Sequence, residues 1–79
     1  MVIRRYTQAM LEAYEQRSRE VIEMFISHRI SFEECKAELD DAFGDVITKV
    51  TGKDLLAVTV LATKNSDAVM DEMKRRGSS

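Results

Sequence analysis

The sequence contains no proline and no tryptophan, and its 79 residues include only three glycines and one cysteine. A single cysteine excludes a disulfide within the chain. A chain of this length has room for one hydrophobic core and buries only about 60–65% of the surface that its unfolded form exposes. Neither a disulfide nor a cluster of zinc ligands is present to compensate. Self-association or very regular helix packing is therefore left as the expected source of stability.

The sequence also lacks an excess of charge of one sign and any long apolar run. Twelve Lys and Arg against fourteen Asp and Glu leave a net charge of −2, which provides no general attraction to nucleic acid. No segment approaches the about 20 apolar residues of a membrane-spanning helix, and the N-terminal segment lacks the apolar stretch of a signal peptide. The lone cysteine fits a reducing compartment. We expect a soluble cytoplasmic protein with the character of small bacterial or phage proteins.

What the sequence does contain favours helix almost everywhere. Hydrophobic residues make up 44% and charged residues 33%, and the abundant Ala, Glu, Met, Leu, Lys and Arg are good helix formers. Apolar spacing and capping signals predict three helices, over about residues 3–29, 32–51 and 53–75, packed antiparallel as one all-α domain over residues 1–76. Residues 77–79 are expected to form a frayed tail.

Two glycines and one β-branched segment affect where the three helices are expected to begin, break or end. Residues 55–61 alone resemble a strand, but an isolated strand would leave its backbone groups unpaired, so they are assigned to the third helix. Gly52 ends the second helix, whereas Gly44 falls inside it and indicates either a close helix crossing or a local break.

The second helix carries the clearest local signals. Ser31 followed by Glu34 forms a capping-box pattern, in which the hydroxyl and the carboxylate each accept a hydrogen bond from an otherwise unpaired backbone N–H. One face is apolar, whereas the opposite face carries a row of carboxylates. This acidic row consists of Glu34, Glu38, Asp41 and Asp45. It is either a solvated face or the recognition surface for another protein; a metal site is disfavoured because the row points away from the apolar face and no Glu-x-x-His pattern is present.

The first and third helices have more apolar surface than one antiparallel neighbour each would cover. The first helix has two adjacent apolar stripes, and the third is apolar around much of its first half. A two-fold symmetric homodimer would cover this excess. The candidate interface residues are Tyr6, Met10, Leu11, Tyr14, Leu56, Val60, Met70 and Met73.

Residues able to carry catalysis are scarce. His28 is the only histidine and Cys35 the only cysteine. His28 falls near a helix end, where an interaction with terminal carbonyls is the expected role rather than proton transfer. Cys35 falls on the apolar face beside two glutamates, which favours a buried structural thiol over a nucleophile. We expect no enzyme activity, and no catalytic, cofactor-binding or metal-binding residues are assigned.

These observations predict a non-enzymatic, homodimeric interaction or regulatory module. Its expected partners are a second copy of itself and another protein that contacts the acidic row. The alternative is a dimeric helical protein that binds nucleic acid through basic clusters at the chain ends. Those clusters consist of Arg4, Arg5, Lys74, Arg75 and Arg76.

Overall fold

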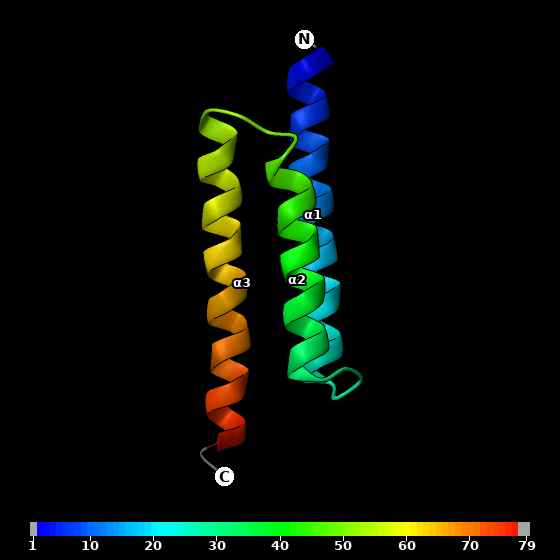
Figure 1. Cartoon of the computed structure of the whole chain (residues 1–79), viewed down its shortest axis with the longest axis vertical. Helices are drawn as coiled ribbons and strands as arrows, with labels where there is room; N and C mark the ends of the chain where they lie inside the picture. The colour runs from blue at the N-terminus through cyan, green and yellow to red at the C-terminus, as the bar shows by residue number, and fades with distance from the viewer. Residues whose placement is uncertain (1, 78–79) are drawn as a thin grey trace.

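The chain folds into three helices that run alternately up and down. The computed structural model describes residues 2–77, and from residue 8 onward it describes the side chains as well. Helix α1 covers Val2–Ile26, α2 covers Phe32–Ile47 and α3 covers Lys53–Gly77. No strand occurs within residues 2–77, so the predicted all-helical class and the helical assignment of residues 55–61 are confirmed. All three helices run along the long axis of the molecule (Figure 1). Helix α1 packs against both other helices, and α2 and α3 have the smallest mutual contact.

Helix α1 ends earlier than predicted because His28 adopts a left-handed backbone conformation, with φ of 66°. The N–H of His28 donates to the carbonyl of Phe25 at 3.1 Å, and the N–H of Arg29 donates to that of Met24 at 2.8 Å. This pair of hydrogen bonds is the Schellman arrangement that closes many helices. Glycine usually occupies the left-handed position, and its absence here explains why residues 27–29 were expected to be helical.

Helix α2 begins at the predicted capping box. The backbone N–H of Ser31 donates to Glu34 Oε1 at 3.0 Å, and the N–H of Glu34 donates to Ser31 Oγ at 3.1 Å. The helix ends at Ile47, with Thr48 as its C-cap, rather than at residue 51. Val50 lies beyond that end, yet it is buried. The linker therefore delivers Val50 to the core, and its place in the apolar pattern does not require helix.

Gly44 neither breaks α2 nor marks a close crossing. The helix is continuous through this position, and a Cβ added to Gly44 would have no neighbouring atom within 4 Å. Gly52 differs in that its φ is +61°. Glycine is favoured at this position because an L-residue costs about 1–2 kcal/mol in this conformation.

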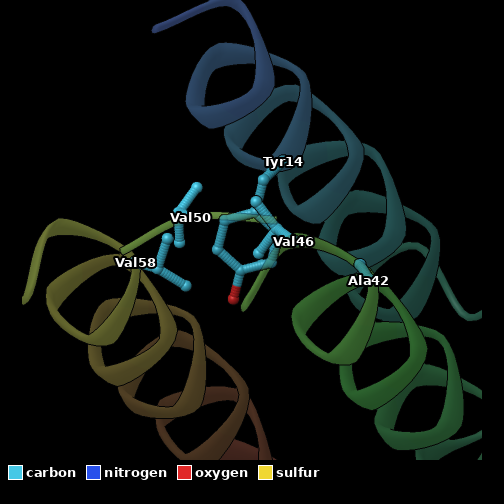
Figure 2. Packing of buried hydrophobic residues seen from close by; sticks show 5 residues of the cluster. All are labelled: Tyr14, Ala42, Val46, Val50 and Val58. Carbon is cyan, nitrogen blue, oxygen red and sulfur yellow. The ribbon is translucent and has the colours of Figure 1, made fainter. Parts of the chain in front are cut away.

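The core consists of two apolar clusters, one above the other along the helices. The upper cluster is built around the ring of Tyr14, which reaches between α2 and α3 toward Val46, Val50 and Val58 (Figure 2). The lower cluster consists of Val21, Ile22, Phe25, Cys35 and Val69. Asn65 Nδ2 donates to the hydroxyl of Tyr14 at 3.3 Å, close to the junction of the two clusters. Burial raises the pKa of that hydroxyl, and the hydrogen bond lowers it in part.

Candidate functional site

The acidic row of α2 lies on the surface, but its members have partners within the chain. Glu34 accepts the capping hydrogen bond from Ser31. Arg17 of α1 bridges Glu38 at 3.0 Å and Asp41 at 3.1 Å. The hydrogen bond to Asp41 and, as the next largest cause, the hydrogen bond to Glu38 raise the pKa of Arg17. Exposed ion pairs of this kind stabilise a fold by at most about 1 kcal/mol each.

Asp45, the last member of the row, pairs with Lys49 at 3.2 Å. Arg17 and Lys49 therefore offset part of the negative charge that the sequence places on this face. The pairing with Arg17 also locates the row on the side of α2 that borders α1, away from α3.

The candidate interface residues separate into two groups. Tyr14 is buried in the upper cluster, and Met10 and Leu11 pack against that cluster. Met73 packs against the lower cluster. The side chain of Tyr6 lies outside the described residues. The apolar excess predicted for α1 is therefore largely taken up by α2 and α3 of the same chain.

The second group lies on the outer face of α3 and is exposed to solvent. Leu56 exposes 69% of its surface, Val60 54% and Met70 52%. At 100° per residue, these three share one side of the helix with three polar residues. We call this set the outer row; it consists of Leu56, Val60, Thr63, Asp67, Met70 and Lys74.

Two threonine hydroxyl groups, one beside the outer row and one within it, are hydrogen-bonded to the backbone of α3 itself. Thr59 Oγ1 donates to the carbonyl of Leu55 at 2.8 Å, and Thr63 Oγ1 donates to that of Thr59 at 2.9 Å. Such back-bonding satisfies the hydroxyl locally and leaves the methyl group as apolar surface. Leu55, with 40% of its surface exposed, extends the patch toward α2. Sequence reasoning did not single out Leu55, although its place beside Leu56 in an apolar run was a usable signal.

A shallow groove of 230 Å³ runs between α2 and α3 next to the outer row. Phe32 and Leu39 line it from α2, and Val69 and Met70 line it from α3. Its volume is below the about 300–1,000 Å³ that is usual for small-molecule sites. Met70 belongs both to this groove, which Lys36, Asp40 and Ser66 also line, and to the outer row.

The C-terminal basic cluster is also engaged within the chain. Glu72, only 5% exposed, accepts hydrogen bonds from Arg75 and from Arg76 Nε, the latter at 2.9 Å. Both hydrogen bonds lower the pKa of Glu72, and the bond from Arg75 has the larger effect. Arg76 Nη2 donates to the carbonyl of Phe25 at 2.6 Å. Two of the three predicted C-terminal cations therefore stabilise the fold, while the side chains of Arg4 and Arg5 lie outside the described residues.

The two residues with catalytic potential lie in different surroundings. Cys35 is completely buried in the lower cluster, and burial raises the pKa of its thiol. His28 is exposed at the end of α1. Among the described residues, no group of three or more His, Cys, Asp or Glu is arranged to hold a metal ion. None of the described helices has an apolar stretch that could cross a membrane.

Comparison with known proteins gives no match, whether to a protein-family model, a curated protein or a solved structure.

Proposed function

We propose that the protein is a non-enzymatic protein-interaction module that acts as a homodimer. The observation that carries this proposal is the exposed apolar surface of α3, centred on Leu56, Val60 and Met70. Single exposed apolar residues are common, but several large ones on one helix face are typical of a protein interface, and here Thr63 and Asp67 separate Val60 from Met70. Burying such side chains is favourable by about 25 cal/mol per Å² of apolar surface.

The elongated shape of the chain supports association with a second protein surface. It extends 50 × 19 × 15 Å, with a radius of gyration of 13.7 Å, compared with about 11.6 Å for a compact domain of this length. Its accessible surface is 5875 Å², whereas a folded monomer of 9.0 kDa exposes about 4,900 Å². The surplus of about 1,000 Å² is comparable to the about 800 Å² that each partner buries in a standard interface.

A partner protein would use a different face. The acidic row borders α1 and lies away from α3, so association through α3 leaves Glu38, Asp41 and Asp45 accessible. A basic partner could exchange the contacts with Arg17 and Lys49 for its own cations, which would favour fast, salt-dependent binding.

Sedimentation velocity or light scattering at micromolar concentration tests the homodimer directly. The expected mass is about twice the 9.0 kDa of the chain. A Val60→Glu, Met70→Glu double variant should sediment as a monomer and keep its helical circular dichroism, because both side chains are exposed. Ala37→Glu is the matched control: it adds a carboxylate at an exposed position of α2 and should remain dimeric. A monomeric parent chain would contradict the proposal.

The partner surface has its own test. A Glu38→Lys, Asp41→Lys double variant should lose a protein that co-purifies with the parent chain, because the charge of the row is reversed. The Val60→Glu, Met70→Glu variant should retain that protein, because the α3 surface and the acidic row are separate faces. Equal recovery with the parent and the lysine variant would exclude the acidic row as the partner surface.

A further inference from the structure

The outer row has the spacing of a helix–helix seam. Its members are separated alternately by four and three residues, from Leu56 and Val60 through to Met70 and Lys74. Positions spaced in this way form the contact line between two helices that cross at a shallow angle. Because the core side of α3 already packs within the chain, through Val58 and Val69, this outer seam is available to a second long helix.

We propose that the occupant is α3 of a second copy, packed antiparallel across a two-fold axis at the level of residue 65. This inference rests on the proposed homodimer and specifies its geometry. In this register Val60 of one chain faces Met70 of the other, and Thr63 faces Asp67. Leu56 then lies opposite Lys74, whose aliphatic stem can cover it.

The charges of the row select the antiparallel direction. A parallel pair in register would place Asp67 against Asp67 near the middle of the seam and Lys74 against Lys74 at its end. Like charges brought together in a partly desolvated contact are destabilising. The antiparallel pair avoids both contacts. Either direction places an apolar residue opposite Val60 and Met70, so the charges alone distinguish the two directions.

Lys64 supplies the complementary charge. It is exposed beside the row, one residue after Thr63. Within the part of the chain that the structure describes, neither Lys64 nor Asp67 takes part in an ion pair or a hydrogen bond made by its side chain. In the antiparallel pair, the Asp67 of each chain meets the Lys64 of the other. The four side chains form a cluster at the axis with two charges of each sign.

The register also makes use of most of α3. The facing pairs run from residue 56 to residue 74, about 27 Å of helix at 1.5 Å per residue. A contact along this whole length is what the surplus accessible surface area of the elongated chain calls for. A contact confined to Leu56 and Val60 would cover only one end of the row.

Cysteine cross-linking in the otherwise unchanged full chain tests this geometry. When Val60→Cys and Met70→Cys chains are mixed and mildly oxidised, a covalent heterodimer should form. Either variant alone should not cross-link, because like positions lie ten residues, or about 15 Å, apart along the antiparallel seam. The parent chain is the control for Cys35, which is completely buried. Cross-linking of Val60→Cys with itself, or none in the mixture, would overturn the register.

Charge reversal provides a second, independent measurement. Asp67→Lys gathers four positive charges at the axis and should raise the dimer Kd by about tenfold or more. The Lys64→Asp, Asp67→Lys swap restores two charges of each sign and should return the Kd to within about threefold of the parent value. A swap as weak as the single variant would contradict the pairing.

The outcomes separate this inference from the proposed function. A parent chain that sediments as a monomer overturns both. A dimeric parent whose Val60→Cys and Met70→Cys chains fail to cross-link overturns only the antiparallel register and leaves the homodimer in place.

Discussion

Arg76 lies over the aromatic ring of Phe25, with its guanidinium carbon 4.2 Å from the ring centroid. The same guanidinium donates to the carbonyl of Phe25 at 2.6 Å. The two residues are 51 positions apart, so this contact ties the end of α3 to the end of α1. Glu72 holds Arg76 from the other side through Nε. A planar group with several donors can make all these contacts at once, which a lysine cannot.

Replacing Arg76 by alanine should therefore lower the free energy of unfolding by about 1–2 kcal/mol, through the lost cation–π contact and charged hydrogen bonds. Arg76→Lys should recover less than half of this loss. Arg75→Ala is the matched control, because the Arg75 side chain is 72% exposed against 30% for Arg76. We expect Arg75→Ala to cost less than Arg76→Ala. Urea denaturation followed by circular dichroism measures all three, and equal losses for Arg75→Ala and Arg76→Ala would contradict this ranking.

Stability should fall in acid through Glu72. Hydrogen bonds from Arg75 and Arg76 lower its pKa in the folded chain, so between the folded and unfolded pKa values the unfolded chain binds more protons. Stability then rises with pH in this window. The contribution is fully present above about pH 5, beyond the unfolded pKa of about 4.3, and is lost as pH falls through the lowered folded value. Thermal unfolding between pH 3 and pH 7 should show a shallower acid limb for Glu72→Gln than for the parent.

Glu12→Gln, at an exposed position of α1, is the control for the loss of one carboxylate. Its unfolding temperature should follow that of the parent across the pH range. If Glu72→Gln and the parent have the same acid limb, Glu72 does not link pH to stability.

Gly44 and Gly52 should respond in opposite directions to alanine. A Cβ meets no atom within 4 Å at either position, but only Gly52 has a positive φ. Gly44→Ala removes a flexible residue from a helix interior and should add about 1 kcal/mol to the free energy of unfolding. That gain raises Tm by about 4–8 °C in a domain of this size. Gly52→Ala should lower stability by about 1–2 kcal/mol. Differential scanning calorimetry decides, and changes of the same sign would contradict the prediction.

Cys35 should be unreactive in the native chain. It is completely buried, and burial raises the pKa of its thiol, so little thiolate is present at neutral pH. Labelling with a disulfide reagent such as Ellman's at pH 7.5 should be about 100-fold or more slower than in the urea-unfolded chain, because it requires opening of the core. In an Ala37→Cys variant, the added exposed thiol should label at once. Rapid labelling of Cys35 in the parent would show that the lower cluster opens readily.

Local signals in the sequence predicted the features that depend on residues three or four positions apart. The capping box at Ser31 and Glu34 and the helical state of residues 55–61 are confirmed. The end of α1 was missed because His28 adopts a conformation normally left to glycine. The end of α2 was missed because Val50 continues the apolar pattern beyond the helix and enters the core from the linker.

The candidate surface was predictable only in part. Sequence reasoning placed Leu56, Val60 and Met70 in the same group as Met10, Leu11, Tyr14 and Met73, since all are apolar residues on helix faces that one neighbour would not cover. Only the packing of α1 against two helices at once shows which of them are used within the chain. The charge pattern was also predictable only in part, because Arg17 pairs with Glu38 and Asp41, which lie 21 and 24 positions further along the sequence.

The sequence by itself determined that this chain is helical, where α2 starts and which face of α2 is apolar. Those properties follow from backbone hydrogen bonds and side-chain contacts within about one helical turn. The tertiary structure decided that Tyr14 is core while Leu56 is exposed, and that Arg76 stabilises the end of α1. These choices depend on how three helices share their apolar faces in space, and residues as far apart as Phe25 and Arg76 meet only once that packing has formed.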